Sequence, residues 1–166
     1  MSEFSRLVPL ARLGGEPFRQ HIAANADERR ALAQRFDLVS LDRLEADVAL
    51  LRELAGTILL SASFAAEFAQ QCIVTLDPVP GSVSEHFALR YGPPEAEEAL
   101  PTGEDDPAFE PLEGESIDIA EAVAQEFSLA LPAFPRAPDA VVETAPEEEP
   151  VDSPFAVLER LRRGAR

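Results

Sequence analysis

The stretch Ile58-Leu-Leu-Ser-Ala-Ser-Phe-Ala-Ala-Glu-Phe68 decides the fold class of this chain. Its even-numbered positions are all apolar: Ile58, Leu60, Ala62, Phe64, Ala66 and Phe68. The odd-numbered positions include Ser61, Ser63 and Glu67. Alternation with a period of two is typical of a β-strand that buries one face. The alanine content leaves a helix as the alternative for this stretch.

The segments before this strand predict a further strand and a helix. Phe4–Leu13 is expected to form a first strand that ends at Gly14-Gly15. Asn25 followed by Glu28 has the spacing of a capping box, which predicts a helix over Asp27–Phe36. Two or three strands are expected after this helix.

The segments after the strand predict a turn, a further strand and a second helix. Asp77–Gly81 is rich in proline and is expected to be a turn, with Val83–Tyr91 as the next strand. Asp118, with Glu121 as its reciprocal partner, is expected to cap a helix that Pro132 ends. One face of that helix carries Ile119, Val123, Phe127 and Leu131. These elements predict an α+β fold, an antiparallel β meander or a partly closed barrel with two packed helices.

Proline and acidic residues divide the chain further. Residues 1–135 are expected to form a single domain that contains an acidic, flexible loop at about 92–116. Residues 136–152 are rich in Pro and Glu and are expected to be a linker. Residues 153–166 are expected to hold a short C-terminal helix, with Ser153 as its N-cap and Pro154 in its first turn.

The terminal helix is the first candidate interaction site. A helix of two to three turns is unstable alone and must dock, either on its own domain or on a partner. Its candidate contact residues are Phe155, Leu158 and Leu161 on one face, with Arg160, Arg162 and Arg163 near its end.

Charge is distributed unevenly along the 166 residues, whose formal net charge is -17. Residues 1–60 carry 9 acidic and 8 basic side chains, whereas residues 61–140 carry 16 acidic and 2 basic ones. Every basic residue is Arg. So acidic a chain repels phosphate backbones and anionic lipid headgroups, and it favours a basic partner. The longest uncharged apolar stretch, Leu54–Ala66, is too short to cross a bilayer, and Met1-Ser2-Glu3 does not begin a signal peptide. A cytoplasmic protein that binds no membrane is therefore expected.

The chain offers few residues for catalysis. His21 and His86 are far apart in sequence, and neither lies in a recognised motif. The single cysteine, Cys72, is expected to be a small buried side chain, and the carboxylates lack the spacing of a calcium loop. We therefore expect no enzyme activity, no cofactor and no metal site.

Several motifs follow one another in the second half of the chain: Phe109-Glu-Pro-Leu-Glu, Ile117-Asp-Ile, Leu129-Ala-Leu-Pro with Pro135, and the ending Ser153-Pro-Phe-Ala-Val-Leu-Glu-Arg-Leu. Together they resemble the bacterial YceD family, whose members are called large ribosomal RNA subunit accumulation proteins. The ending is similar to the C-terminal helix of the family. Phe4-Ser-Arg and Asp27-Glu-Arg-Arg-Ala-Leu-Ala are similar to its alphaproteobacterial branch. Many members carry Cys-x-x-Cys where this chain has Cys72-Ile-Val-Thr75, so a role for a thiol pair is not expected here.

The resemblance implies a role in accumulation of the large-subunit (23S) ribosomal RNA and supplies no catalytic residues. Three functions are compared. In the first, a non-enzymatic factor in ribosome biogenesis binds a basic ribosomal protein or a large-subunit assembly intermediate. In the second, Arg160, Arg162, Arg163 and the Arg residues of the first 60 positions bind ribosomal RNA directly, which the overall charge disfavours. The third, an RNA-processing enzyme, lacks both a base and a metal constellation.

Overall fold

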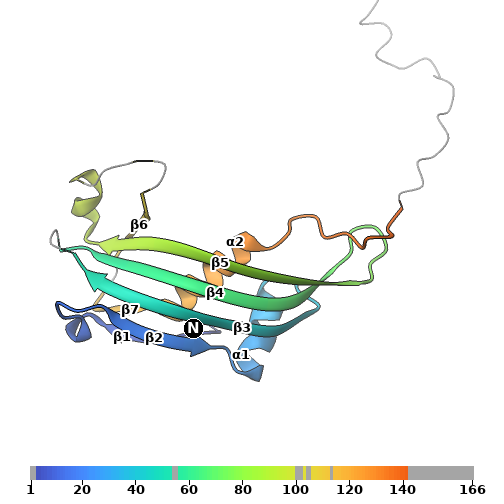
Figure 1. Cartoon of the computed structure of the whole chain (residues 1–166), viewed down its shortest axis with the longest axis horizontal. Coiled ribbons are helices and arrows are strands. Elements are labelled where there is room, and N and C mark those ends of the chain that lie inside the picture. Colours follow the sequence, from blue (N-terminus) through green and yellow to red (C-terminus); the bar gives the residue numbers. More distant parts are fainter. Residues whose placement is uncertain (1–2, 54–55, 100–102, 104–105, 113, 142–166) are drawn as a thin grey trace, which may run out of the picture.

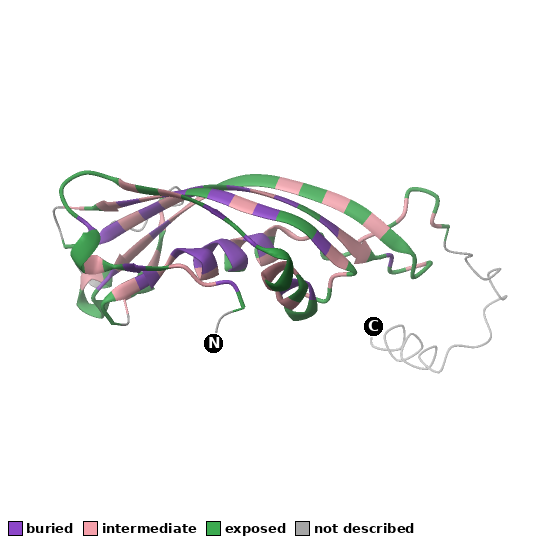
Figure 2. Cartoon of the chain, turned by 90° about the horizontal axis from the view of Figure 1, so that it is seen from below, coloured by how far each residue is buried: buried purple, intermediate pink, exposed green. Residues whose placement is uncertain are grey.

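The computed structural model describes residues 3–53, 56–99, 103, 106–112 and 114–141. In this part of the chain, an open five-stranded sheet carries two α-helices on one face, and a small two-stranded sheet lies beside it (Figures 1 and 2). The fold is therefore α+β. The large sheet runs from β2 at one edge to β6 at the other, so the described strands close no barrel.

The large sheet is antiparallel except at one edge. Its strands, in spatial order, are β2 (Phe18–Ala23), β3 (Ser40–Arg52), β4 (Ile58–Gln71), β5 (Pro78–Gly92) and β6 (Ala108–Pro111). Only the β5–β6 pair is parallel. The small sheet pairs β1 (Leu7–Pro9) with β7 (Ser116–Asp118), and two short 3-10 helices are η1 (Leu10–Arg12) and η2 (Pro94–Ala99).

The central strand β4 confirms the prediction made from its alternating pattern. Its even-numbered side chains from Ile58 to Phe68 are all buried, and its odd-numbered ones face the open side of the sheet. The alternative, a helix over this stretch, is wrong. The branched and aromatic residues at every second position suit a half-buried pleated surface better than a helix.

Both helices begin where the capping residues predict. Helix α1 (Ala26–Arg35) has a capping box between Asn25 and Glu28, and helix α2 (Ile119–Ala130) is capped by Asp118. The Asp118 carboxylate accepts hydrogen bonds from the N–H groups of Ala120 and Glu121 at 3.2 and 3.3 Å. The Glu121 carboxylate forms a bidentate pair with Arg35 of α1, at 2.7 and 3.0 Å, and so ties the two helices together.

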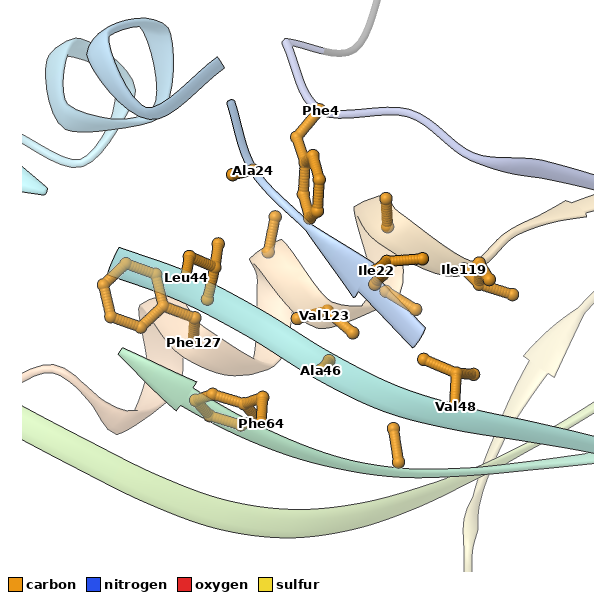
Figure 3. Packing of buried hydrophobic residues seen from close by; sticks show 14 of the residues in the cluster. Phe4, Ile22, Ala24, Leu44, Ala46, Val48, Phe64, Ile119, Val123 and Phe127 are labelled. Carbon is orange, nitrogen blue, oxygen red and sulfur yellow. The ribbon is translucent and has the colours of Figure 1, made fainter. Parts of the chain in front are cut away.

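The aromatic side chain of Phe127 joins the helices to the sheet. It is fully buried, and its ring makes edge-to-face contacts with Phe64 and Phe68 of β4 and with Phe36 after α1. Figure 3 shows Phe127 and Val123 of α2 against the same face of the sheet as Leu44 and Phe64. The core therefore lies between α2 and the inner faces of β3 and β4.

Two local predictions near the strands need correction. Of Phe4–Leu13, only Leu7–Pro9 is a strand, because Leu10–Arg12 turns into a 3-10 helix. The turn predicted at Asp77–Gly81 is also wrong, because β5 already begins at Pro78 and the chain turns at residues 73–75 instead. Pro78 and Pro80 fit a strand here because they lie in an edge strand, where a missing N–H need not break a ladder bond.

The acidic stretch at 92–116 is more structured than the prediction of a flexible loop. Its described residues include the 3-10 helix η2 and the strand β6, and β6 pairs with β5 from Leu89↔Ala108 to Gly92↔Pro111. Half-buried apolar residues in an otherwise acidic stretch, such as Leu112 against the core, explain the order. The predicted linker 136–152 is described only to Val141, and the predicted helix at 153–166 lies outside the described residues.

We expect Phe127→Ala to be strongly destabilising. The substitution leaves a cavity where three aromatic rings meet, and such changes cost about 3–5 kcal/mol. The matched control is Leu129→Ala on the same helix, whose side chain is 79% exposed and whose loss should change stability by about 0.5 kcal/mol or less. Denaturant unfolding measures both. Equal effects of the two substitutions would contradict this account of the core.

Candidate interaction surface

The candidate interaction residues predicted from the sequence belong to the C-terminal segment. Phe155, Leu158, Leu161, Arg160, Arg162 and Arg163 all lie outside the described residues. The candidate surface is therefore built from the charged and polar side chains between Glu3 and Val141.

Arginine side chains neutralise much of the acid in the N-terminal half. Arg6 binds Glu28 at 2.7 Å, and the same guanidinium holds the pKa of that carboxyl below its usual range. Across the open face of the sheet, Arg43 bridges Glu45 and Glu67 at 2.6 and 3.0 Å. These pairs occupy several of the cations that an anionic ligand would need.

The acid of the second half is arranged differently. Glu85 on β5 and Glu110 on β6 both act electrostatically on Glu126 of α2, and we call these three residues the carboxylate cluster; Glu110 and Glu126 also act on the half-buried Tyr91. Glu110 lies opposite Tyr91 in the β5–β6 register. No Arg of the described residues lies within ion-pair distance of any of the three carboxylates.

The pKa values of Glu126 and Tyr91 are shifted in an environment that has no nearby cation among the described residues. Partial burial, together with the negative charges of Glu85 and Glu110, raises the pKa of Glu126 above its usual value. Burial, with the charges of Glu110 and Glu126 adding to it, raises the pKa of Tyr91 to about 12. Both shifts mean that negative charge is unfavourable here, first because of burial and then because of neighbouring carboxylates, so a cation beside Glu126 would be stabilising.

The sheet also brings the two histidines into one row, which sequence reasoning missed. Register pairs His21 with Asp47, Asp47 with Ser63, and Ser63 with His86 across β2, β3, β4 and β5. This row lines a shallow hollow of about 410 Å³ on the open face. The signal that could have found it is the outward position of all four residues in alternating strands.

The hydrogen bonds within this row do not make a catalytic triad. Asp47 binds His21 at 2.9 Å, whereas the hydroxyl of Ser63 contacts the other histidine, His86, at 3.1 Å. The carboxylate thus orients a histidine two strands away from the serine, roughly 10 Å at the usual strand spacing. We assign no reaction to the row.

Cys72 is buried, as expected, but its sulfur is also a hydrogen-bond acceptor. Sγ accepts from the backbone N–H groups of Val74, Thr75 and Ala137, each at 3.4 Å. A hydrogen bond from the Thr75 side chain, supported by these amides, lowers the pKa of the thiol to about 6. Thr75, three residues after Cys72, thus contacts the sulfur through both its backbone N–H and its side chain.

In the described residues, no three side chains of His, Cys, Asp or Glu come together as ligands for a metal ion. No helix among them is long and apolar enough to cross a membrane.

Comparison with known proteins gives one match. The family model described as "Large ribosomal RNA subunit accumulation protein YceD" matches residues 60–162, more than half of the chain. No curated protein and no solved structure matches. The matched range includes β5, β6 and α2, and hence all three members of the carboxylate cluster.

We expect Glu126→Gln to raise the thermal stability at pH 7. Because the folded state raises the pKa of Glu126, the contribution of this group is greatest below its unfolded pKa and declines as the pH rises through the folded pKa. Replacing the charged form by a neutral amide of the same shape removes that loss. Glu16→Gln, an exposed change of the same charge, is the control, and thermal unfolding is the measurement. A lower melting temperature for Glu126→Gln than for this control would contradict the interpretation.

We expect Cys72 to titrate with a pKa of about 6 in the folded chain, followed by the ultraviolet absorbance of the thiolate. Thr75→Val removes the hydroxyl donor but keeps the backbone N–H, and should move the titration upward. Since folding lowers this pKa, its stabilising effect is present at about pH 9 and is lost as the pH falls through 6. The Cys72→Ser variant, which has no thiol, gives the background absorbance. A titration near pH 9 in the folded protein would contradict the role of these hydrogen bonds.

Proposed function

The chain belongs to the YceD family, and on that premise we propose that it acts without catalysis, by binding a basic ribosomal protein. The family's description implies a role in accumulation of the large ribosomal RNA subunit. The partner would be a protein of that subunit, alone or within an assembly intermediate. RNA would then accumulate because the protein that packages it is kept available for assembly.

The observation that carries this proposal is the carboxylate cluster without a cation. Glu126 of α2 lies within electrostatic range of Glu85 on β5 and of Glu110 on β6, and its pKa is raised first by partial burial and then by the charges of these two carboxylates. An Arg or Lys of a partner would remove this repulsion and gain charge-assisted hydrogen bonds, which are the strong ones in proteins. Electrostatic attraction to the acidic half would also speed the encounter.

Direct binding of ribosomal RNA is the less favoured function. Arg6, Arg35, Arg43 and Arg90 are all engaged by carboxylates of the same chain, so a phosphate would compete with existing ion pairs. An RNA backbone would also have to overcome the overall negative charge. This function would use Arg160, Arg162 and Arg163, which lie outside the described residues, together with arginines of the first 60 positions that form no described ion pair, such as Arg12, Arg19 and Arg52.

A capture experiment separates the two partners. The tagged full chain is incubated at low salt with lysate of its own cells, with and without ribonuclease, and retained proteins and RNA are identified separately. We expect basic large-subunit proteins to remain after ribonuclease. If every protein is lost together with the RNA, the binding of a basic protein is wrong and RNA is the partner.

Substitutions then test the surface. Glu85→Gln, Glu110→Gln and Glu126→Gln together should weaken binding of the retained protein about tenfold or more, because each charge-assisted contact contributes about 1.5–3 kcal/mol. The matched control neutralises three exposed carboxylates of the N-terminal half: Glu16→Gln, Asp37→Asn and Asp42→Asn. Isothermal titration at two salt concentrations measures both. Equal losses in the two triple variants would mean that only net charge matters and that this surface is not the site.

A further inference from the structure

Strand β5 has a long outer edge that pairs with no described strand. On one side it pairs with β4 from Pro78 to Tyr91, but on the other it pairs with β6 only from Leu89 to Gly92. Figure 1 shows β5 as the outermost long strand, with β6 beside one end only. Two prolines, Pro78 and Pro80, occupy the opposite end. Between these prolines and the segment that pairs with β6, residues 81–88 form a free edge about 26 Å long at the usual rise of a strand.

Two observations show which backbone groups point outward from this edge. The N–H of Leu112 donates to the carbonyl of Gly92 at 2.8 Å, on the side of β6. Pro78 and Pro80 have no N–H and so cannot donate to β4. Backbone groups alternate in direction along a strand, and the β4–β5 register has no shift. The N–H and C=O groups of Ser82, Ser84 and His86 therefore point away from the sheet.

The side chains flanking this edge have a definite pattern. On the face that carries α2, Val83 and Phe87 are half-buried apolar residues, and Glu85 lies between them as a member of the carboxylate cluster. On the open face, Ser82, Ser84 and His86 are small or polar. Residues of an added strand would face these side chains directly.

We propose that the β5 edge binds an extended, basic segment of the partner protein as an additional strand. The segment would place an Arg or Lys opposite Glu85, within reach of Glu126, and apolar residues two positions to either side, opposite Val83 and Phe87. Its main-chain groups would pair with those of Ser82, Ser84 and His86. This inference rests on the proposed function and names the structure and chemistry of the bound segment.

Charge decides among the possible occupants. A second copy of this chain would bring its own Glu85 and a net charge of -17 to the same edge, which is repulsive. A neutral strand would leave the cluster without its cation. The apolar–x–basic–x–apolar pattern satisfies both the apolar and the acidic part of the edge.

The test uses the full chain and the labelled peptide acetyl-Arg-Val-Ser-Arg-Thr-Val-Arg-amide. Two further versions of this peptide are methylated on the backbone nitrogen of alternate residues, one at the odd and one at the even positions. Only one set of N–H groups can face β5, so one version should lose about tenfold or more in affinity, as expected for two or three hydrogen bonds. The other version should bind like the unmodified peptide. Equal binding of all three peptides would overturn the added-strand geometry and leave only charge attraction.

Variants of the chain test the same edge from the other side. Ser84→Pro removes an outward N–H without removing a bond to β4, and it should abolish peptide binding, whereas Ser84→Ala should not. Ser82→Pro extends the native proline series by one step and gives a second blocking variant if Ser84→Pro does not fold. Binding by a folded proline variant that equals wild type would overturn the proposal.

Amide exchange and mass measurements identify any other occupant. In the free full chain the N–H groups of Ser82, Ser84 and His86 should exchange rapidly and become protected by the peptide. Protection before peptide is added would show that the chain's own segment or a second copy occupies the edge, and ultracentrifugation would tell these apart; either result overturns the proposal. If the proline variant still retains basic large-subunit proteins, the edge is wrong but the proposed function stands. If the peptide binds at the edge but the chain retains no basic large-subunit protein from the lysate, the edge binds an added strand and the proposed function is wrong.

Discussion

The fold depends on the contact between Phe127 and the buried face of β4. Four rings meet there, from α2, from the end of α1 and from two alternate positions of β4. Because β4 is the middle strand of the large sheet, fixing its buried face fixes the inward face of β3 and β5 through the ladder register. The helices therefore occupy one side of the sheet only. The outward positions, including the histidine row, remain on the open side.

The same arrangement separates two kinds of acidic residue. Several of them meet arginines, as Glu28 meets Arg6, Glu121 meets Arg35 and Glu67 meets Arg43, because the helices pack together and the strands align opposite charges. Those at the junction of α2 with β5 and β6 meet other carboxylates, as Glu126 does. Natural proteins keep such unfavourable groups where function needs them, at some cost to stability. A surface that loses stability through its own charge and regains it with a bound cation is suited to reversible binding of a basic partner.

The sequence was sufficient for those elements whose signals are local. The alternation in Ile58–Phe68 and the capping residues Asn25 and Asp118 depend on neighbours within a few positions, and the structure confirms them. The strand β6 could not be predicted, because four residues in an acidic stretch become a strand only by pairing with β5. The carboxylate cluster joins positions from three separate elements, so its composition was visible in the sequence but its geometry was not. Pro78 and Pro80 predict a turn from the sequence alone, although the same residues also suit an edge strand, which the structure shows.

An unpaired strand edge is normally a liability, because it can pair with another copy of the same chain and aggregate. Here two features restrict it. Pro78 and Pro80 remove the outward donors from one end, and β6 covers the other. The remaining stretch carries Glu85, which would face a carboxylate of equal charge in a second copy. The charge of Glu85 disfavours pairing with a second copy without closing the edge, since a strand with a cation at the matching position is attracted where a second copy is repelled. The residues that prevent aggregation would thus also select the partner, and a single substitution to an uncharged side chain, such as Glu85→Val, would remove both effects at once.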